Sequence, residues 1–202
     1  MKRRKLLVAL VLTCAMLLSA CGGDAGKLVG KWNATLDLTD YIVQEMVAQD
    51  PSLEAYAKFE NLSFTFQFEF TKDTVALTVD EASTQQFITN AETGIINMID
   101  AMVADMAAEA NETPEDVFAG MNMTRETFIK ATMNSLRLES MVKEMVEVLT
   151  LSGSYVAEGD TITVIYEDNT YEEMKFAFGK EDLTITVSDG TNNFVFVCKE
   201  AK

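Results

Sequence analysis

The chain has 202 residues, of which 48% are hydrophobic and 24% are charged, and this balance predicts one or two globular domains rather than a disordered chain. Its 32 acidic and 16 basic residues give a net charge of −16, which argues against nucleic acid as a partner, because phosphate backbones are bound mainly by Lys and Arg. Histidine is absent, so catalytic triads and zinc sites that need histidine are excluded.

The first 20 residues have the pattern of a secretory signal peptide. The basic segment Lys2–Lys5 precedes an apolar run, Leu6–Leu18, whose 13 residues are fewer than the roughly 20 that a membrane-spanning helix needs. The sequence Leu-Ser-Ala-Cys at Leu18–Cys21 resembles the lipobox of bacterial lipoproteins. This resemblance implies cleavage before Cys21 and a diacylglycerol group on its sulfur. The alternative is an ordinary signal peptide with a cysteine near its end.

Cleavage before Cys21 would leave a mature chain of 182 residues with a net charge of −20. Because anionic headgroups repel such a chain, the acyl chains are expected to hold it on the extracytoplasmic face of the cell membrane or outer membrane. Residues 21–27 are glycine-rich and are predicted to form a flexible lipidated tether. Since Cys14 leaves with the signal and Cys21 carries lipid, Cys198 is predicted to be a buried thiol with no intramolecular disulfide.

Alternating apolar residues predict eight strands within residues 28–202. The clearest strand is 61–70, where phenylalanines alternate with polar residues, which indicates one buried face. A first strand is expected at 28–38, a third at 75–79, and five more between residues 150 and 198, with turn residues between them. The predicted fold is mainly β with a helical insertion: an antiparallel barrel of about eight strands.

A helical segment is predicted between the first and second strands. Thr39 is expected to cap a short helix over 40–49, and Asp50 is expected to cap a second helix that has Pro51 at its first position.

A larger helical insertion, residues 83–149, is predicted between the third and fourth strands. Ser83 and Gln86 have the spacing of a capping box at its start. Two long helices are expected, joined by a short helix that begins at Thr113–Asp116, and they are expected to form an antiparallel hairpin packed on the barrel. Because no segment has the composition of an interdomain linker, residues 28–202 are interpreted as one domain.

The residues Gly30, Lys31 and Trp32 at the start of the first predicted strand resemble the Gly-x-Trp signature of lipocalins and their calycin relatives. The resemblance implies a barrel of eight antiparallel strands, which in this family often holds a small apolar ligand. It also implies that a basic residue of the last strand, here Lys199, stacks on Trp32. Gly30, Trp32 and Lys199 are therefore expected to be structural residues. The helical insertion at 83–149 departs from the family pattern.

Five methionines at helical spacing are the candidate ligand-binding residues, because thioether side chains adapt to varied apolar surfaces. They are expected to form an apolar seam where the two long helices meet each other and the barrel: Met98, Met102, Met106, Met141 and Met145. Two alternatives are simple core filling and Cu(I) binding, although no histidine or second cysteine supports a metal. The phenylalanines of the strands either fill the barrel or leave a ligand-sized cavity in it.

No pattern in the chain predicts an enzyme. Glu172 and Glu173 are neighbours on a strand and point to opposite faces, which does not suit a glycosidase pair. The segment 167–169 lacks the spacing of a calcium loop and is expected to be a solvated turn.

The expected function is the binding of a small apolar molecule between barrel and helices. The alternative is a non-enzymatic interaction module that contacts an envelope protein through the helical insertion. No metal is expected, and no cofactor apart from the lipid on Cys21.

Overall fold

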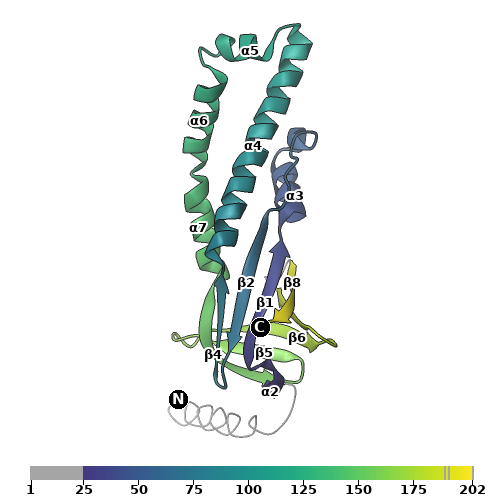
Figure 1. Ribbon diagram of the computed structural model, residues 1–202, viewed down its shortest axis with the longest axis vertical. Coiled ribbons are helices and arrows are strands. Elements are labelled where there is room, and N and C mark those ends of the chain that lie inside the picture. The colour runs from purple at the N-terminus through teal and green to yellow at the C-terminus, as the bar shows by residue number, and fades with distance from the viewer. Residues whose placement is uncertain (1–24, 189, 191, 202) are drawn as a thin grey trace, which may run out of the picture. The chain divides into compact units, whose positions relative to one another are not determined.

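The computed structural model describes residues 25–188, 190 and 192–201. The predicted signal peptide, its cleavage site and Cys21 lie outside the described residues. Within the described part, eight antiparallel strands form a closed barrel in chain order (Figure 1). The predicted eight-stranded antiparallel barrel is therefore confirmed. Its strands are β1 (Gly30–Asp37), β2 (Ser63–Phe70), β3 (Thr74–Val79), β4 (Leu151–Glu158), β5 (Thr161–Ile165), β6 (Tyr171–Phe178), β7 (Leu183–Ser188) and β8 (Asn193–Glu200).

Among the described residues, helices occur at three places in the chain order: α2 (Ala25–Leu28) precedes β1, a short pair follows β1, and four helices follow β3. The short pair is α3 (Thr39–Gln49) and the 3-10 helix η1 (Pro51–Leu53). The four are α4 (Glu81–Ala110), α5 (Pro114–Gly120), α6 (Arg125–Leu136) and α7 (Leu138–Leu149). The described residues form two compact parts, which we call the barrel unit (residues 25–36, 65–79, 149–188, 190 and 192–201) and the helical unit (37–64 and 80–148).

The core of the barrel unit consists of the inward side chains of alternate strand residues. Phe66 and Phe68 are fully buried and meet the Phe196 ring edge-on, with centroid distances of 5.1 and 5.4 Å. The side chains that complete this core are at most 6% exposed: Phe70, Val75, Leu77, Ile162, Val164, Met174, Phe176, Leu183, Ile185 and Cys198. Side chains this inaccessible pack against one another across the barrel, so the described side chains occupy its interior.

Strand pairing fixes which side chains share an end of the barrel. Phe178 of β6 is opposite Leu183 of β7, and Leu183 is opposite Cys198 of β8. The last residues of β8 pair with the start of β1, where Glu200 lies opposite Trp32. The start of β1 and the ends of β6 and β8 therefore meet at one end of the barrel.

The helical unit is organised around α4, a helix of 30 residues. Its buried residues recur every three or four positions, as one face of a helix requires: Phe87, Ile88, Ala91, Gly94, Ile95, Ile99, Val103 and Ala107. Phe64 stacks on Phe87 with ring centroids 4.4 Å apart. The ring of Phe59 lies directly against Gly94, where a β-carbon would overlap it. Glycine at this position thus permits a close approach between an aromatic ring and the helix backbone.

Two of the predicted helix starts are wrong. Thr39 is the first residue of α3 rather than its cap, and its hydroxyl accepts the Leu62 backbone N–H at 2.9 Å. The start of α4 lies before the predicted capping box at Ser83 and Gln86. Asp80 is the N-cap, and its carboxylate accepts the Ser83 N–H at 2.8 Å. An aspartate three residues earlier satisfies the same donor, so Ser83 is already inside the helix.

Two other predicted helix N-termini are confirmed. The Asp50 side chain caps η1, which has Pro51 at its first position. Thr113 and Asp116 form a reciprocal capping box at the start of α5, with the Asp116 carboxylate accepting the Thr113 N–H at 3.0 Å.

The prediction of the second long helix is wrong in one respect, because this segment forms two helices, α6 and α7. Arg137 adopts a left-handed conformation with φ of 50° and separates α6 from α7. The start of α6 is held to α4 by Arg125, whose Nε donates to Asp100 at 2.7 Å. A left-handed residue ends the helical hydrogen-bond ladder, so the apolar stripe of α6 does not continue in phase along α7.

Candidate functional site

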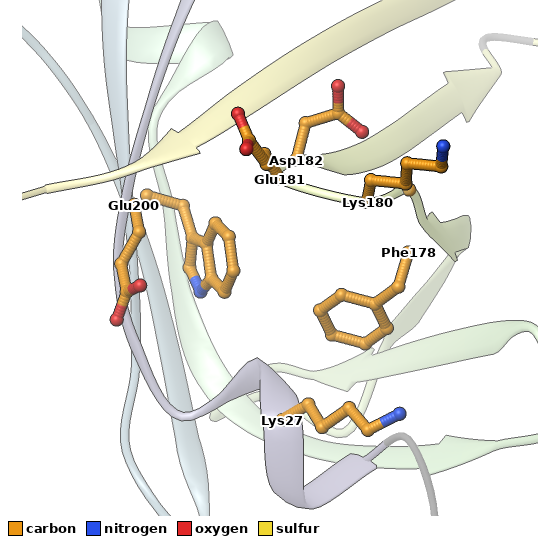
Figure 2. Close-up of a pocket in the computed structure, with 8 residues that line it drawn as sticks. Lys27, Phe178, Lys180, Glu181, Asp182 and Glu200 are labelled. Atoms are coloured by element: carbon orange, nitrogen blue, oxygen red, sulfur yellow. The ribbon is translucent and has the colours of Figure 1, made fainter.

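A concave site of the barrel unit lies at the end where β1, β6 and β8 meet (Figure 2). We call it the end pocket. It has a volume of about 340 Å³, within the range of small-ligand sites. It is lined by Lys27, Trp32, Phe178, Gly179, Lys180, Glu181, Asp182 and Glu200.

An aromatic pair forms the wall of the end pocket. Trp32 is 8% exposed, and its ring lies 6.0 Å from that of Phe178 at an angle of 59°. The indole N–H donates to the Leu28 carbonyl at 2.8 Å, which anchors helix α2 to the first strand. Residues 25–28 were expected to belong to the flexible tether and to the first strand, and this expectation is wrong. The buried Leu28 side chain and the indole bond stabilise a helical turn there.

The predicted stacking of Lys199 on Trp32 is also wrong. Because side chains alternate along a strand, the buried Cys198 places Lys199 on the outer face of β8. Its ammonium instead reaches the Asp182 carboxylate at 3.5 Å. The cation next to the aromatic pair is Lys27 of α2, whose Nζ lies 5.8 Å from the centre of the Phe178 ring.

Charges of both signs surround the aromatic wall. Glu181, Asp182 and Lys180 lie on one side of the Phe178 ring and Lys27 on the other (Figure 2). Asp182 is engaged by Lys199 and by its own turn, where its carbonyl accepts the Gly179 N–H at 2.9 Å. Within the described residues, the side chains of Glu181, Glu200 and Lys180 make no ion pair or hydrogen bond. Two carboxylates and one ammonium are thus available to a ligand.

A second pocket, of about 360 Å³, lies in the helical unit and is lined by Lys58, Glu60, Asn61, Asn90, Thr93, Gly94 and Asn97. The amide of Asn90 is already engaged there, since its Nδ2 donates to the Asn61 carbonyl at 2.9 Å. None of the residues that line this pocket is aromatic, so it lacks the aromatic wall that the end pocket provides for a ligand.

The five candidate methionines do not form the buried seam that was expected. Met106 and Met141 are 53% and 57% exposed, and Met98, Met102 and Met145 are half-buried. The buried face of α4 is displaced by one residue, to Ile99 and Val103, which turns it about 100° around the helix. The only fully buried residue of α7 is Val142. Packing against β-branched residues, rather than against thioethers, holds these helices.

The remaining candidates serve the structure. The Tyr166 hydroxyl donates to Glu172 at 2.6 Å, and burial, aided by this carboxylate, raises the pKa of Tyr166. Asp168 accepts hydrogen bonds from the hydroxyl and backbone N–H of Thr170, which lower its pKa and close the turn at 167–170. Cys198 is fully buried, and burial raises the pKa of its thiol to about 12. Among the described residues, no group of three or more Asp, Glu or Cys is arranged to hold a metal.

Sequence reasoning missed Lys27, Phe178, Lys180, Glu181 and Glu200 as members of one site. The residues lie at the ends of elements far apart in the chain, and only the pairing of β1 with β8 brings them together. The alternation along β8 was the one available signal, since it places Glu200 rather than Lys199 on the inner face.

No helix within the described part of the chain has the length and apolarity needed to cross a membrane. Comparison with protein-family models, with curated proteins and with solved structures found no match to this chain.

Proposed function

We propose that this chain is a lipoprotein of the cell envelope, held by diacylglycerol on Cys21 at the extracytoplasmic face of the cell membrane or outer membrane. The support is the order of the first 21 residues: a basic segment, a short apolar run and the lipobox-like Leu-Ser-Ala-Cys. A net charge of −20 for the chain from Cys21 onward makes attachment by electrostatics alone implausible, so the acyl chains carry the attachment.

The barrel is proposed to be lipocalin-like and non-enzymatic. Its eight antiparallel strands and the Gly-Lys-Trp sequence at the start of β1 support this assignment. The observation that supports a site outside the barrel interior is the burial of the described core side chains, which occupy that interior. We therefore propose binding of a small molecule at the end pocket, in place of a ligand enclosed by the barrel or by the methionine seam.

An interaction module remains the second candidate function. The helical unit exposes apolar side chains that a protein partner in the envelope could bury. They are between 39% and 85% exposed: Met106, Met121, Met123, Leu136, Met141 and Val148.

Two measurements test the proposal. Metabolic labelling with palmitate should label the wild-type chain and the matched control Cys198→Ser, whereas Cys21→Ser should remain unlabelled and unprocessed. Labelling of Cys21→Ser would refute the lipoprotein assignment. Native mass spectrometry of the purified protein should then detect a small molecule that is lost from Glu200→Gln and retained by Met102→Leu. Loss of the molecule from Met102→Leu alone would favour the methionine seam instead.

A further inference from the structure

We propose that the end pocket binds a zwitterionic ligand in which an ammonium and a phosphate are joined by a short linker, the chemistry of a phosphoethanolamine headgroup. The inference rests on the proposed function for its location near a bilayer, but its chemistry comes from the pocket itself. That chemistry combines an aromatic wall, two unengaged carboxylates and two ammonium groups around one cavity of about 340 Å³.

The ammonium end of the ligand is matched by Glu200, Glu181 and the ring of Trp32. Glu200 lies opposite Trp32 in the pairing of β1 with β8, so its carboxylate and the indole border the same space. A carboxylate beside an aromatic face is favourable for an organic ammonium, through charge and through the cation–π interaction. The indole N–H is already bonded to Leu28, so the tryptophan presents its ring and not its donor.

The phosphate end is matched by Lys180 and Lys27. Lys180 makes no ion pair within the described part of the chain, and Lys27 lies over Phe178 on the other side of the ring. A ligand with only a positive charge would meet these ammonium groups, and a ligand with only a negative charge would meet Glu181 and Glu200. A zwitterion satisfies both signs at once.

The lipid anchor would bring the pocket to such headgroups. Lys27 is six residues from Cys21, a distance that an extended chain spans with at most about 20 Å. With Cys21 acylated, the end pocket therefore stays close to the bilayer surface, where the local concentration of headgroups is high. A free phosphoamine could supply the same chemistry, and the experiment separates the two sources.

Trp32 is the only tryptophan of the chain, so its emission reports on the end pocket directly. The full chain, purified in a detergent free of phosphate and amine, is titrated with phosphoethanolamine, ethanolamine and inorganic phosphate. Phosphoethanolamine should change the emission saturably, and each half alone should bind at least about tenfold more weakly.

Matched variants assign the two ends. Glu200→Gln and Glu181→Gln should weaken phosphoethanolamine binding about tenfold each, whereas Glu173→Gln, on the outer face of β6, should not. Lys180→Gln should weaken it, whereas Lys72→Gln, in the β2–β3 turn, should not. Each variant is first shown to unfold at the wild-type temperature, and Glu181 and Lys180 lie in an exposed turn whose variants keep the core intact.

A vesicle measurement identifies the source of the ligand. The acylated protein is placed in vesicles with and without phosphatidylethanolamine. A change of Trp32 emission only in the vesicles that contain it supports a lipid headgroup; a response to soluble phosphoethanolamine alone supports a free phosphoamine. No saturable response to either, or equal binding of ethanolamine and phosphoethanolamine, would overturn the proposal. The soluble titration does not need the anchor, so it is decided independently of the lipoprotein assignment.

Discussion

The indole N–H of Trp32 and the carbonyl oxygen of Leu28 are 2.8 Å apart and buried, and this bond joins the segment that follows the proposed tether to the first strand of the barrel. Trp32 thus has two structural roles: its ring forms the wall of the end pocket with Phe178, and its indole nitrogen anchors helix α2. A change at Trp32 is expected to affect both stability and binding.

Two replacements of Trp32 should separate the contribution of the indole hydrogen bond to stability from that of the ring. Trp32→Phe keeps a ring but leaves the Leu28 carbonyl without its donor, and we expect a loss of about 1–3 kcal/mol in the free energy of unfolding. Trp32→Ala also removes the ring and should cost about 3–5 kcal/mol. Urea unfolding followed by circular dichroism measures both. Tyr171→Ala, at a side chain that is 70% exposed, is the control and should change stability little.

The contact between Phe59 and Gly94 predicts opposite effects for two glycine substitutions in helices. Gly94→Ala places a methyl group inside the space of the Phe59 ring and should destabilise the helical unit by about 1–3 kcal/mol. Gly120→Ala, at the end of α5, meets nothing within 4 Å and should be neutral or stabilising by up to about 1 kcal/mol. Thermal unfolding of the two variants compares them, and equal melting temperatures would show that the ring does not pack against Gly94.

The ion pair of Asp100 with Arg125 should make stability depend on pH at its acidic end. The hydrogen bond from Arg125 lowers the pKa of Asp100 below its usual 3.8, against a smaller effect of burial. The stabilisation is therefore complete above a pH of about 3.8 and is lost as the pH falls through the lowered pKa. Because both side chains are partly exposed, Asp100→Asn should cost only about 0.2–1 kcal/mol at neutral pH.

The measurement for this pair is the difference in melting temperature between wild type and Asp100→Asn from pH 7 down to pH 2. The difference should shrink at the acidic end and with added salt. The control Glu112→Gln, an exposed residue beyond the end of α4, should show no such trend. A difference that grows on acidification would contradict the pairing.

Cys198 should be chemically inert in the folded protein. Its thiol is fully buried and its pKa is raised to about 12, so almost no thiolate forms at pH 8. Alkylation with iodoacetamide, followed by mass spectrometry of the peptide that contains Cys198, should show modification only after denaturation. Rapid alkylation without denaturant would mean that this end of β8 opens to solvent.

The sequence predicted the barrel because its signal is local. In β2, the phenylalanines at 64, 66, 68 and 70 alternate with polar residues, and every one of them is buried. Turn residues then separate the five C-terminal strands at the expected places. Period-two alternation reports directly on the buried face of a strand, so the strands could be located without tertiary information.

Helical faces were harder to assign. Residues 98, 102 and 106 and residues 99, 103 and 107 of α4 follow the same spacing, and spacing alone does not decide which stripe is buried. One feature of the sequence indicates the break between α6 and α7 at Arg137. Apolar residues on one face of a helix recur every three or four positions, but the predicted stripe advances by five residues from Leu136 to Met141.

The end pocket could not be predicted because it depends on strand register. The choice between Lys199 and Glu200 as the neighbour of Trp32 depends on which residues of β8 face inward, and the burial of Cys198 decides it. The resemblance to lipocalins led to the wrong prediction of Lys199 as the neighbour of Trp32. It matched Lys199 by its place near the end of the last strand and did not take into account which face of the strand that residue occupies.

The diacylglycerol proposed on Cys21 can be detected through the mass of the N-terminal peptide. Protein purified from the membrane fraction of its host is digested, and the peptide that ends at Lys27 is analysed by mass spectrometry. We expect a peptide that begins at Cys21 and carries a diacylglycerol on its sulfur. An unmodified peptide, or one that begins at another residue, would contradict the lipoprotein assignment.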